Sequence, residues 1–346
     1  MFRRMLLSVF ACVIAAAAQP PVHSETSVAL QHNGVTGQTA RLILFSVPGA
    51  TETYPTSIND DGVIAGWYAD ANGGHGFLRG LSGGFVTFSA PGSPDIFPSS
   101  INAGGAVAGN YGAPQYGFLR APDGDWTTFN VPGTFPSSSG NPIVINDSGL
   151  IAGPYFDGSR THGFLRALNG SFLTIDAPAS TSTDATGLNA GGTVTGTYDD
   201  ASYTPHGFIR AIDGTWTSFD VPGNNFGFFP PTLSINDSGV VVGQYLLVST
   251  TYGFLWQAGG ALVTFNVPGA QGTLPSGINS GGAVAGSYYD TSSVYQGFLR
   301  IPSGTVYTFS VPGATGTYVT GINDSGMIAG SYQDDTNTSH GFLLIP

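Results

Sequence analysis

The sequence predicts an all-β protein, a seven-bladed β-propeller of four-stranded antiparallel blades, and two observations lead to that prediction. From about residue 42 to residue 346 the chain repeats itself seven times with a period near 44 residues, which is typical of a propeller blade or a two-helix solenoid unit. No window shows a sustained helical period, and 52 glycines and 23 prolines would interrupt one. The helical solenoid is therefore excluded.

Two landmarks define the register of the repeat: an asparagine that follows Ile or Leu, and a Gly-Phe pair. The asparagines are Asn59, Asn102, Asn146, Asn189, Asn236, Asn279 and Asn323. The glycines of the pairs are Gly76, Gly117, Gly163, Gly207, Gly253, Gly297 and Gly341. Successive asparagines lie 43, 44, 43, 47, 43 and 44 residues apart, so the units follow one another without large insertions.

The first unit shows the four strands in order. Residues 54–58 form a strand that enters a turn at residues 59–62, and residues 63–68 follow as an apolar, β-prone second strand. After a polar loop, residues 76–79 and 85–90 form the third and fourth strands around a Ser-Gly turn. Each unit therefore has enough strands for one propeller blade.

Turn residues support the last hairpin and the end of each unit. Asp-Gly or Asn-Gly dipeptides, which tolerate the positive φ angles of a type I′ turn, stand in the hairpin at Asp123, Asn169 and Asp213. A proline follows each fourth strand, where its missing N–H affects only a strand end. These prolines are Pro48, Pro91, Pro132, Pro178, Pro222, Pro268 and Pro312.

The two ends of the repeat region complement each other. Residues 341–346 form a third strand with no fourth strand after it, whereas residues 42–49 form a fourth strand with no unit before it. We expect the N-terminal strand to complete the last blade, which leaves no open sheet edge. A parallel β-helix is the alternative fold, but its coils are shorter and lack regular hairpin turns.

Three segments are expected along the chain. Residues 1–18 resemble a secretory signal peptide, with Arg3 and Arg4 before an apolar stretch that ends in a run of alanines. Residues 19–41 are expected to be a flexible lead-in, and residues 42–346 the single propeller domain. No other apolar run is long enough to span a bilayer. We therefore expect a secreted or periplasmic protein.

Charge excludes one class of partner. The chain contains no lysine, and loss of residues 1–18 with their two arginines changes the formal net charge from −12 to −14. Such a chain would be repelled by nucleic acid. We expect a monomer without a cofactor.

Residues that recur in most units are interpreted first as structural. We expect the repeated asparagines to cap their turns through bonds to their own backbone. Histidines before the Gly-Phe pair (His75, His162, His206 and His340) lie in the same position of different units, so they would not converge on a metal. The Tyr-x-Asp segments that follow the second strand supply one carboxylate per unit, too few for calcium. No metal site is predicted, and calcium binding at these loops is the alternative to a role of the carboxylates in forming the turn.

The units resemble a known family. Residues 322–332, Ile-Asn-Asp-Ser-Gly-Met-Ile-Ala-Gly-Ser-Tyr, followed by His340-Gly-Phe-Leu343, are similar to the bacterial HAF repeats, named for a His-Ala-Phe triplet after an Ile-Asn-x-x-Gly-x-x-x-Gly stretch. The likeness covers residues 42–346, with Gly in place of Ala in every copy. It implies an exported protein with a repetitive β fold, and it implies no reaction, cofactor or catalytic residue.

Function is therefore sought where the repeat is broken. Alternation of strands places the Asn turns on one face of the propeller and the variable loops on the other, and binding sites favour variable loops on a rigid scaffold. The largest deviations are Phe226, Phe228 and Phe229 in the fifth unit and Phe135 in the third. These phenylalanines are expected either to form an aromatic platform for a ligand or to plug the mouth of the central channel. Glu52 and Arg160 are polar candidates, together with Asp95 and Asp184.

Two hypotheses for function follow. The first is an exported, non-catalytic binding or scaffold protein that holds a glycan, a peptide or an envelope protein on the variable-loop face. The alternative is a secreted propeller hydrolase or lyase that acts on polysaccharide. An enzyme of that kind needs converging carboxylates or a histidine-containing set. Only two glutamates occur in the chain and no nucleophile motif is present, so no catalytic residue is predicted.

Overall fold

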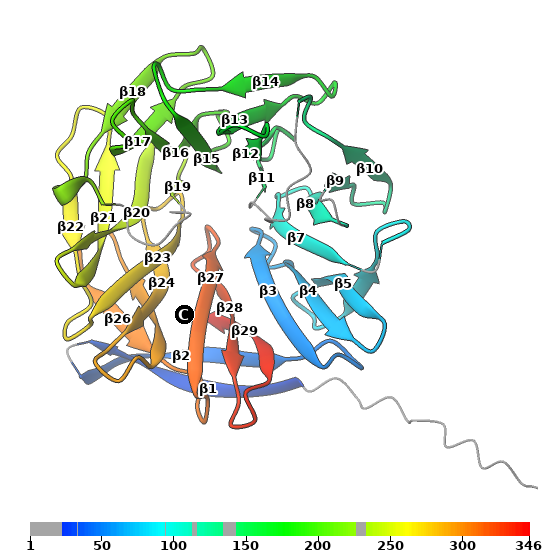
Figure 1. The fold of residues 1–346 in the computed structure, drawn as a ribbon. Coiled ribbons are helices and arrows are strands. Elements are labelled where there is room, and N and C mark those ends of the chain that lie inside the picture. The colour runs from blue at the N-terminus through cyan, green and yellow to red at the C-terminus, as the bar shows by residue number, and fades with distance from the viewer. Residues whose placement is uncertain (1–22, 33, 94, 113–115, 134–142, 226–232) are drawn as a thin grey trace, which may run out of the picture.

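The computed structural model describes residues 23–32, 34–93, 95–112, 116–133, 143–225 and 233–346. These residues contain 29 strands and a single three-residue 3₁₀ helix, Pro222–Asn224, so the predicted all-β class is confirmed. Figure 1 shows the sheets arranged side by side around a central axis. Among the described residues, no helix has the length and apolar character needed to cross a lipid bilayer.

Four sheets each contain four antiparallel strands, as predicted for a blade. The first holds β3 (Glu52–Ile58), β4 (Ile64–Asp70), β5 (Gly73–Arg79) and β6 (Phe85–Phe88). The second holds β7 (Ile96–Ile101), β8 (Val107–Tyr111), β9 (Tyr116–Arg120) and β10 (Trp126–Phe129). The third holds β11 (Val144–Ile145), β12 (Ile151–Phe156), β13 (Thr161–Arg166) and β14 (Phe172–Ile175), and the fourth β15 (Ser182–Leu188), β16 (Val194–Asp199), β17 (Pro205–Arg210) and β18 (Trp216–Phe219).

The remaining strands belong to one connected sheet of 13 strands. Its groups are β19 (Ser234–Ile235), β20 (Val240–Leu247), β21 (Thr250–Gln257) and β22 (Val263–Phe265), then β23 (Gly272–Ile278), β24 (Val284–Tyr289), β25 (Tyr295–Arg300) and β26 (Val306–Phe309). The last strands are β27 (Gly316–Ile322), β28 (Ile328–Gln333) and β29 (Ser339–Ile345). Single bridges join these groups, such as Thr251 to Gly272. The sheet is therefore a chain of blade-like groups rather than one continuous surface.

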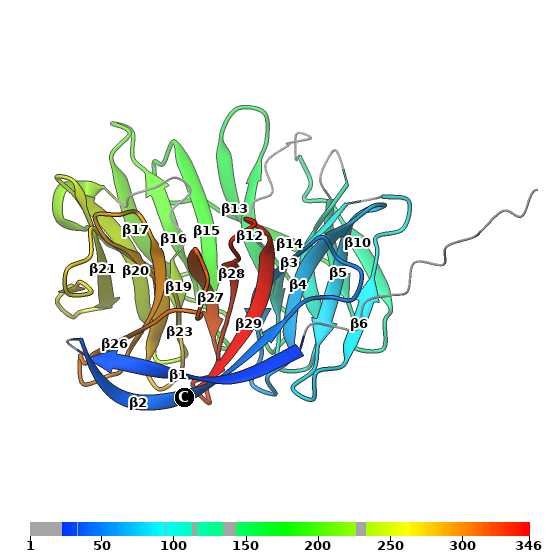
Figure 2. The same cartoon turned by 90° about the horizontal axis from the view of Figure 1, so that it is seen from below.

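The N-terminal strand closes the structure. Strand β2 (Val35–Phe45) pairs antiparallel with β29, so that Arg41 to Phe45 lie opposite Ile345 to Gly341. The prediction that the segment starting at residue 42 adds a strand to the last unit is thereby confirmed. Figure 2 shows β1 and β2 side by side at the edge of the molecule, next to the C-terminal strand.

Residues 19–41 are not a flexible lead-in over their described part, which corrects that prediction. Strand β1 (His23–His32) pairs with β2 along its whole length. Val28 and Leu30 are buried against the last two groups of strands, in a cluster that includes Leu299 and Phe309. The alternating apolar positions of residues 27–30 are few and flanked by polar residues, a pattern that does not distinguish a strand from a polar lead-in.

The Gly-Phe pairs build the contacts between neighbouring sheets. The seven phenylalanines of these pairs are 0 to 2 % exposed. They are Phe77, Phe118, Phe164, Phe208, Phe254, Phe298 and Phe342. The glycine is required because the ring of the fourth strand lies directly over it: a Cβ on Gly207 would lie 2.2 Å from the ring of Phe219. Close packing of this kind explains why the pair recurs in every unit.

The repeated asparagines form a closed ring of hydrogen bonds. Each side-chain Nδ2 donates to the backbone carbonyl of the asparagine in the next unit, over 2.9 to 3.2 Å. The bond from Asn323 to the carbonyl of Asn59, 2.9 Å, completes the circle. Each Oδ1 also accepts the backbone N–H four residues later, for example Leu150 to Asn146, which confirms the predicted turn cap. The bond between units is not predicted by the sequence.

Arginines at the ends of third strands also join neighbouring sheets. The guanidinium of Arg79 lies 4.6 Å from the ring centroid of Phe45, and Arg120 stacks in the same way over Phe88 at 4.9 Å. Arg166 and Arg300 repeat the contact with the fourth-strand phenylalanine of the preceding unit. Burial in this position lowers the pKa of Arg79 from its ordinary value.

Candidate functional site

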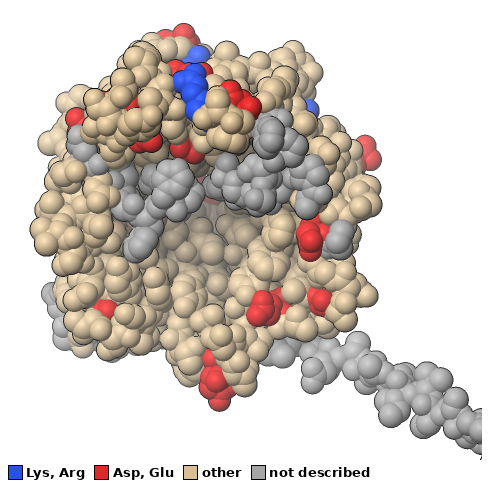
Figure 3. Space-filling model, viewed as in Figure 1, with Lys and Arg blue, Asp and Glu red and all other residues tan. Residues whose placement is uncertain are grey.

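A cavity of about 740 Å³ occupies the wide part of the central axis. First strands of several groups line it, with Phe97, Leu274 and Tyr318 at one level of the wall, and Trp67 and Tyr295 join them from neighbouring strands. In Figure 3 the molecule is hollowed at its centre, and tan atoms line the hollow. Its volume lies within the usual range for small-molecule sites.

The lining of this cavity is aromatic and hydroxylated. Beside the aromatic residues, the polar side chains include Thr56, Ser99, Thr186, Ser276 and Gln244. Among the described residues that line it there is no Asp, Glu, His, Lys or Arg. Such a wall offers stacking surface and neutral hydrogen-bonding groups.

The aromatic side chains form two clusters. Tyr54 stacks on Trp67 with ring centroids 4.3 Å apart, and Trp67 meets Phe97 edge to face at 5.6 Å. Tyr295 lies 5.0 Å from Tyr318 in the second cluster, and burial raises the pKa of Tyr295. β3 and β7 belong to the first two units and β25 and β27 to the last two, and β27 is a neighbour of β3, so the clusters lie on either side of the closure of the chain. We call these residues the aromatic arc.

The opposite end of the axis is narrow and regular. A cavity of about 230 Å³ there is lined by ring asparagines of six units and by Asp60, Asp147, Asp237 and Asp324. Each carboxylate accepts the backbone N–H of a residue in the preceding unit, such as Ala103 to Asp147 over 2.7 Å and Asp324 to Asp60 over 2.9 Å. These exposed aspartates therefore reinforce the contacts between units.

Glu52 and Arg160, predicted as binding residues, lie in different sheets. Glu52 starts β3 and accepts a hydrogen bond of 2.6 Å from the hydroxyl of Tyr54, which places it beside the aromatic arc. Arg160 lies in the loop between β12 and β13, where it donates to Asp176 Oδ2 over 3.1 Å and to the carbonyl of Ser180 over 2.7 Å. Glu52 therefore lies near the cavity, whereas Arg160 belongs to a separate polar network.

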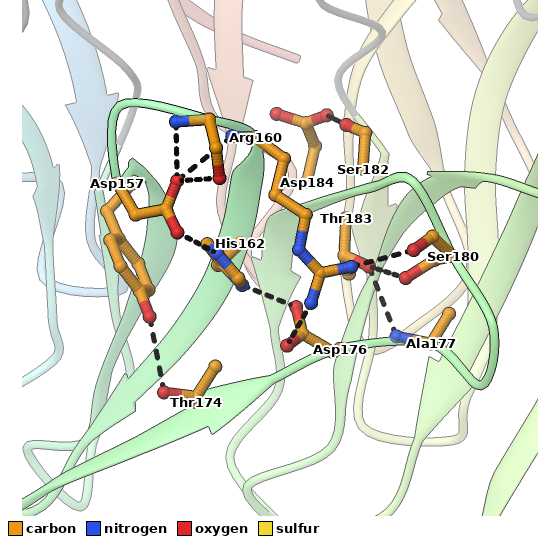
Figure 4. A network of polar contacts seen from close by, with 12 residues as sticks. Asp157, Arg160, His162, Thr174, Asp176, Ala177, Ser180, Ser182, Thr183 and Asp184 are labelled. Atoms are coloured by element: carbon orange, nitrogen blue, oxygen red, sulfur yellow. Dashed lines mark hydrogen bonds and ion pairs between the residues drawn. The ribbon is translucent and has the colours of Figure 1, made fainter. Parts of the chain in front are cut away.

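That network surrounds His162, as Figure 4 shows. His162 Nδ1 lies 2.8 Å from Asp176 Oδ1, and Nε2 lies 3.1 Å from Asp157 Oδ2. The backbone N–H of Arg160 also bonds to Asp157, and this bond first of all lowers the pKa of the Asp157 carboxyl. Every polar group here has a structural partner, so the network holds the loop in place.

The other three histidines have the same kind of environment. His75, His206 and His340 each lie against a tyrosine ring at 5.0 to 5.2 Å and contact the aspartate of the Tyr-x-Asp segment. These contacts agree with the structural role that the sequence predicts for residues that recur in most units. Within the described ranges, no three His, Cys, Asp or Glu side chains gather in a way that suits a metal ion.

Asp184 differs from its counterparts in the other units. It lies in β15, five residues before the ring asparagine, and is 6 % exposed. Burial raises its pKa to about 6, and the nearby charge of Asp199 adds to the shift. Burial likewise raises the pKa of Asp199. Two carboxyl groups with raised pKa values therefore lie in the fourth sheet.

Several sequence predictions lie outside the described residues. Phe226, Phe228, Phe229 and Phe135 are among them, and so is the signal segment, residues 1–18. Asp95 is exposed just before β7, where its carbonyl accepts the N–H of Gly112. Trp67 and Tyr318, which line the cavity, are missed by the sequence analysis, although Trp67 is the sole tryptophan at its position of the repeat.

Comparisons with known proteins concern the fold alone. No protein-family model matches the chain, and no curated protein matches it. A catalytically inactive virginiamycin B lyase from Staphylococcus aureus, solved with quinupristin, has a TM-score of 0.57 at 13% identity over 94% of this chain and 99% of that one. The β-propeller domain of the Trilobed protease from Pyrococcus furiosus has a TM-score of 0.54 at 9% identity, over 83% and 97% of the two chains. The Dos1 propeller has 0.51 at 12%, over 93% of each chain. The fold is a β-propeller.

Proposed function

We propose that this chain is an exported, non-catalytic binding propeller whose ligand enters the wide part of the central cavity from the variable-loop face. The observation that carries the proposal is the cavity of about 740 Å³ with its aromatic arc and neutral polar groups. Ligand sites in proteins typically combine an apolar, aromatic wall with a few polar groups. A glycan suits this wall because a sugar ring presents an apolar face to aromatic rings and hydroxyls to serine and threonine.

We infer that the scaffold has seven blades. Seven repeats in the sequence, seven ring asparagines and the bond from Asn323 back to Asn59 support that number. In this arrangement β2 is the outer strand of the last blade and β1 lies outside it as an additional strand. A closed ring holds the wall of the cavity rigid, which favours binding without a cost of ordering.

Binding is favoured over catalysis because of the chemistry of the wall. A hydrolase or lyase needs an acid and a base, or a nucleophile, at the bound substrate. The described lining residues supply hydroxyls, one amide and aromatic rings instead. The likeness to a lyase, at 13% identity, concerns the fold and brings no activity to this chain.

Export is proposed from residues 1–18, whose arginine pair and apolar stretch are typical of a secretory signal. The test is cell fractionation of the full chain, followed by N-terminal sequencing of the mature protein. We expect a mature chain that begins near residue 19 and lies outside the cytoplasm. An uncleaved chain in the cytoplasm would contradict export.

The ligand proposal is tested with a glycan array and a pair of tryptophan variants. Trp67→Ala removes the largest ring of the aromatic arc, so we expect at least a tenfold loss of affinity for any glycan that the unmodified protein binds, on the order of 1.4 kcal/mol or more. Trp216→Ala is the matched control, because Trp216 lies in the outer strand β18, away from the cavity, where it stacks on Phe208 of the neighbouring strand.

Circular dichroism of both variants checks the fold. Affinity that survives Trp67→Ala unchanged would place the site elsewhere. Cleavage of the same oligosaccharides by the unmodified protein would favour the hydrolase or lyase instead.

A further inference from the structure

The first strands of five groups carry structurally equivalent residues at one level of the axis. Each of these residues lies five positions before the ring asparagine of its unit. Its partner in the second strand lies eight positions after that asparagine. The set is Tyr54, Phe97, Asp184, Leu274 and Tyr318. Phe97, Leu274 and Tyr318 line the cavity, and Thr186, Gly187 and Leu188 line it from the strand of Asp184. Asp184 thus occupies, two residues before Thr186 in β15, the position at which the other groups carry an apolar or aromatic residue, although its own side chain is not part of the described lining.

The carboxyl of Asp184 is poorly compensated. It is 6 % exposed, and among the described residues its one hydrogen bond comes from the Ser182 hydroxyl over 3.4 Å. A buried carboxylate normally needs a cation or several donors to offset its desolvation. Asp184 therefore costs stability in the free protein, which is the behaviour of a residue kept for binding rather than for folding.

Arg160, a cation in the loop between β12 and β13 of the third sheet, is already engaged. In Figure 4 the Arg160 side chain reaches from its loop to Asp176, where it donates to the carboxylate over 3.1 Å and to the Ser180 carbonyl over 2.7 Å. Asp199 lies close enough to Asp184 to add negative potential. With no lysine in the chain, this side of the cavity attracts a positive group from outside.

We propose that the central cavity takes an organic ammonium ligand, with its cationic group on the Asp184 side and its apolar or aromatic body against the aromatic arc. This rests on the proposed function, because it assigns a ligand class to the same cavity. An ammonium group compensates the buried carboxylate, and aromatic faces attract both a cation and an apolar body. Amine-bearing glycans and peptides are members of this class.

Two probes of nearly equal size test the charge. The first is 2-phenylethylamine, which is cationic at pH 7.5, and the second is 2-phenylethanol, which is neutral. We expect calorimetric titration of the mature protein to show about tenfold or tighter binding of the amine, because charge-assisted contacts are stronger than neutral ones. Asp184→Asn should reduce this preference to about threefold or less while the affinity for 2-phenylethanol stays the same.

Asp125→Asn is the matched control, since Asp125 is exposed beside a hairpin turn of the second sheet and the substitution changes the net charge equally. It should leave the preference intact. Thermal unfolding confirms that both variants are folded.

The outcomes separate the two proposals. A preference for the amine that depends on Asp184 and not on Asp125 supports the ammonium site. Equal binding of both probes that is weakened by Trp67→Ala overturns the ammonium site and leaves the cavity as a neutral binding site. If neither probe binds at millimolar concentration, the ammonium site is wrong; failure of the glycan array as well would remove the proposed function.

Discussion

The two ends of the central axis differ in how strictly the repeat is kept. At the narrow end every unit contributes the same asparagine, and each is 3 to 8 % exposed and bonded to the next unit. At the wide end equivalent positions carry a tyrosine, a phenylalanine, an aspartate and a leucine. Repetition at one end stabilises the ring, and variation at the other end makes its two sides chemically different.

This difference assigns stability to one end and recognition to the other. Loss of an asparagine should weaken folding with little effect on ligand, because the ring lies beyond the wide cavity. Change of a residue at the wide end should alter binding, and at Asp184 it should even raise stability. Three changes to the chain test this division.

Removal of residues 19–45 should have the largest effect. It removes β1 and β2, exposes the edge of β29 and uncovers Leu299, Phe309 and Leu344, which now pack against the hairpin. We expect a chain that is unfolded or aggregated at 25 °C, a loss of more than about 5 kcal/mol. Circular dichroism and gel filtration measure this. Removal of residues 19–22 alone is the control, and an equally damaging result there would contradict the role of closure.

Asn146→Ala should destabilise the protein by about 2 to 4 kcal/mol in urea unfolding. The substitution removes the bond to the carbonyl of Asn189, 2.9 Å, and leaves the N–H of Leu150 without its acceptor at a site that is 5 % exposed. Asn169→Ala, at an exposed hairpin turn, should cost less than about 1 kcal/mol. Ligand affinity should be unchanged in both variants. A stable Asn146→Ala protein without affinity would move recognition to the narrow end.

Asp184→Asn should increase stability at neutral pH. The folded-state pKa of about 6 lies above the ordinary value of 3.8, so the unfolded chain loses this proton first and ionisation of Asp184 lowers stability as pH rises from about 4 to 6. A shift of this size corresponds to about 2 to 3 kcal/mol. The gain should be near zero at pH 4 and complete above pH 7, as measured by unfolding at several pH values. An equal gain at all pH values would show that the carboxyl is not the cause.

Much of the fold follows from local signals in the sequence. The asparagine spacing, the Asp-Gly turns and the strand left over at each end predict four-stranded units and closure by the N-terminal strand, and pairing of Arg41 to Phe45 with β29 confirms the closure. The sequence does not predict strand β1, because its apolar positions, Val28 and Leu30, make a pattern too short to distinguish from a polar linker.

The candidate site follows much less from the sequence. Deviation from the repeat draws attention to Glu52 and Asp184, because a single sequence shows which unit departs from its siblings. The sequence does not predict that the aromatic residues of the cavity share one site, because Phe97 and Tyr318 are separated by more than 200 residues. Phe97 and Tyr318 line the same cavity because closure of the ring brings the first and last units side by side.

By itself, the sequence determined the repeat, the strand content, the turn chemistry and the complementary ends, because period, glycine, proline and asparagine act locally on the backbone. The packing of the folded chain is needed to show which residues face the axis, that the ring asparagines bond from unit to unit, and that Asp184 is buried with little compensation beside an uncharged cavity. The physical reason is that burial, the pKa of a carboxyl and the shape of a cavity depend on neighbours distant in the chain, which are set when the circle closes.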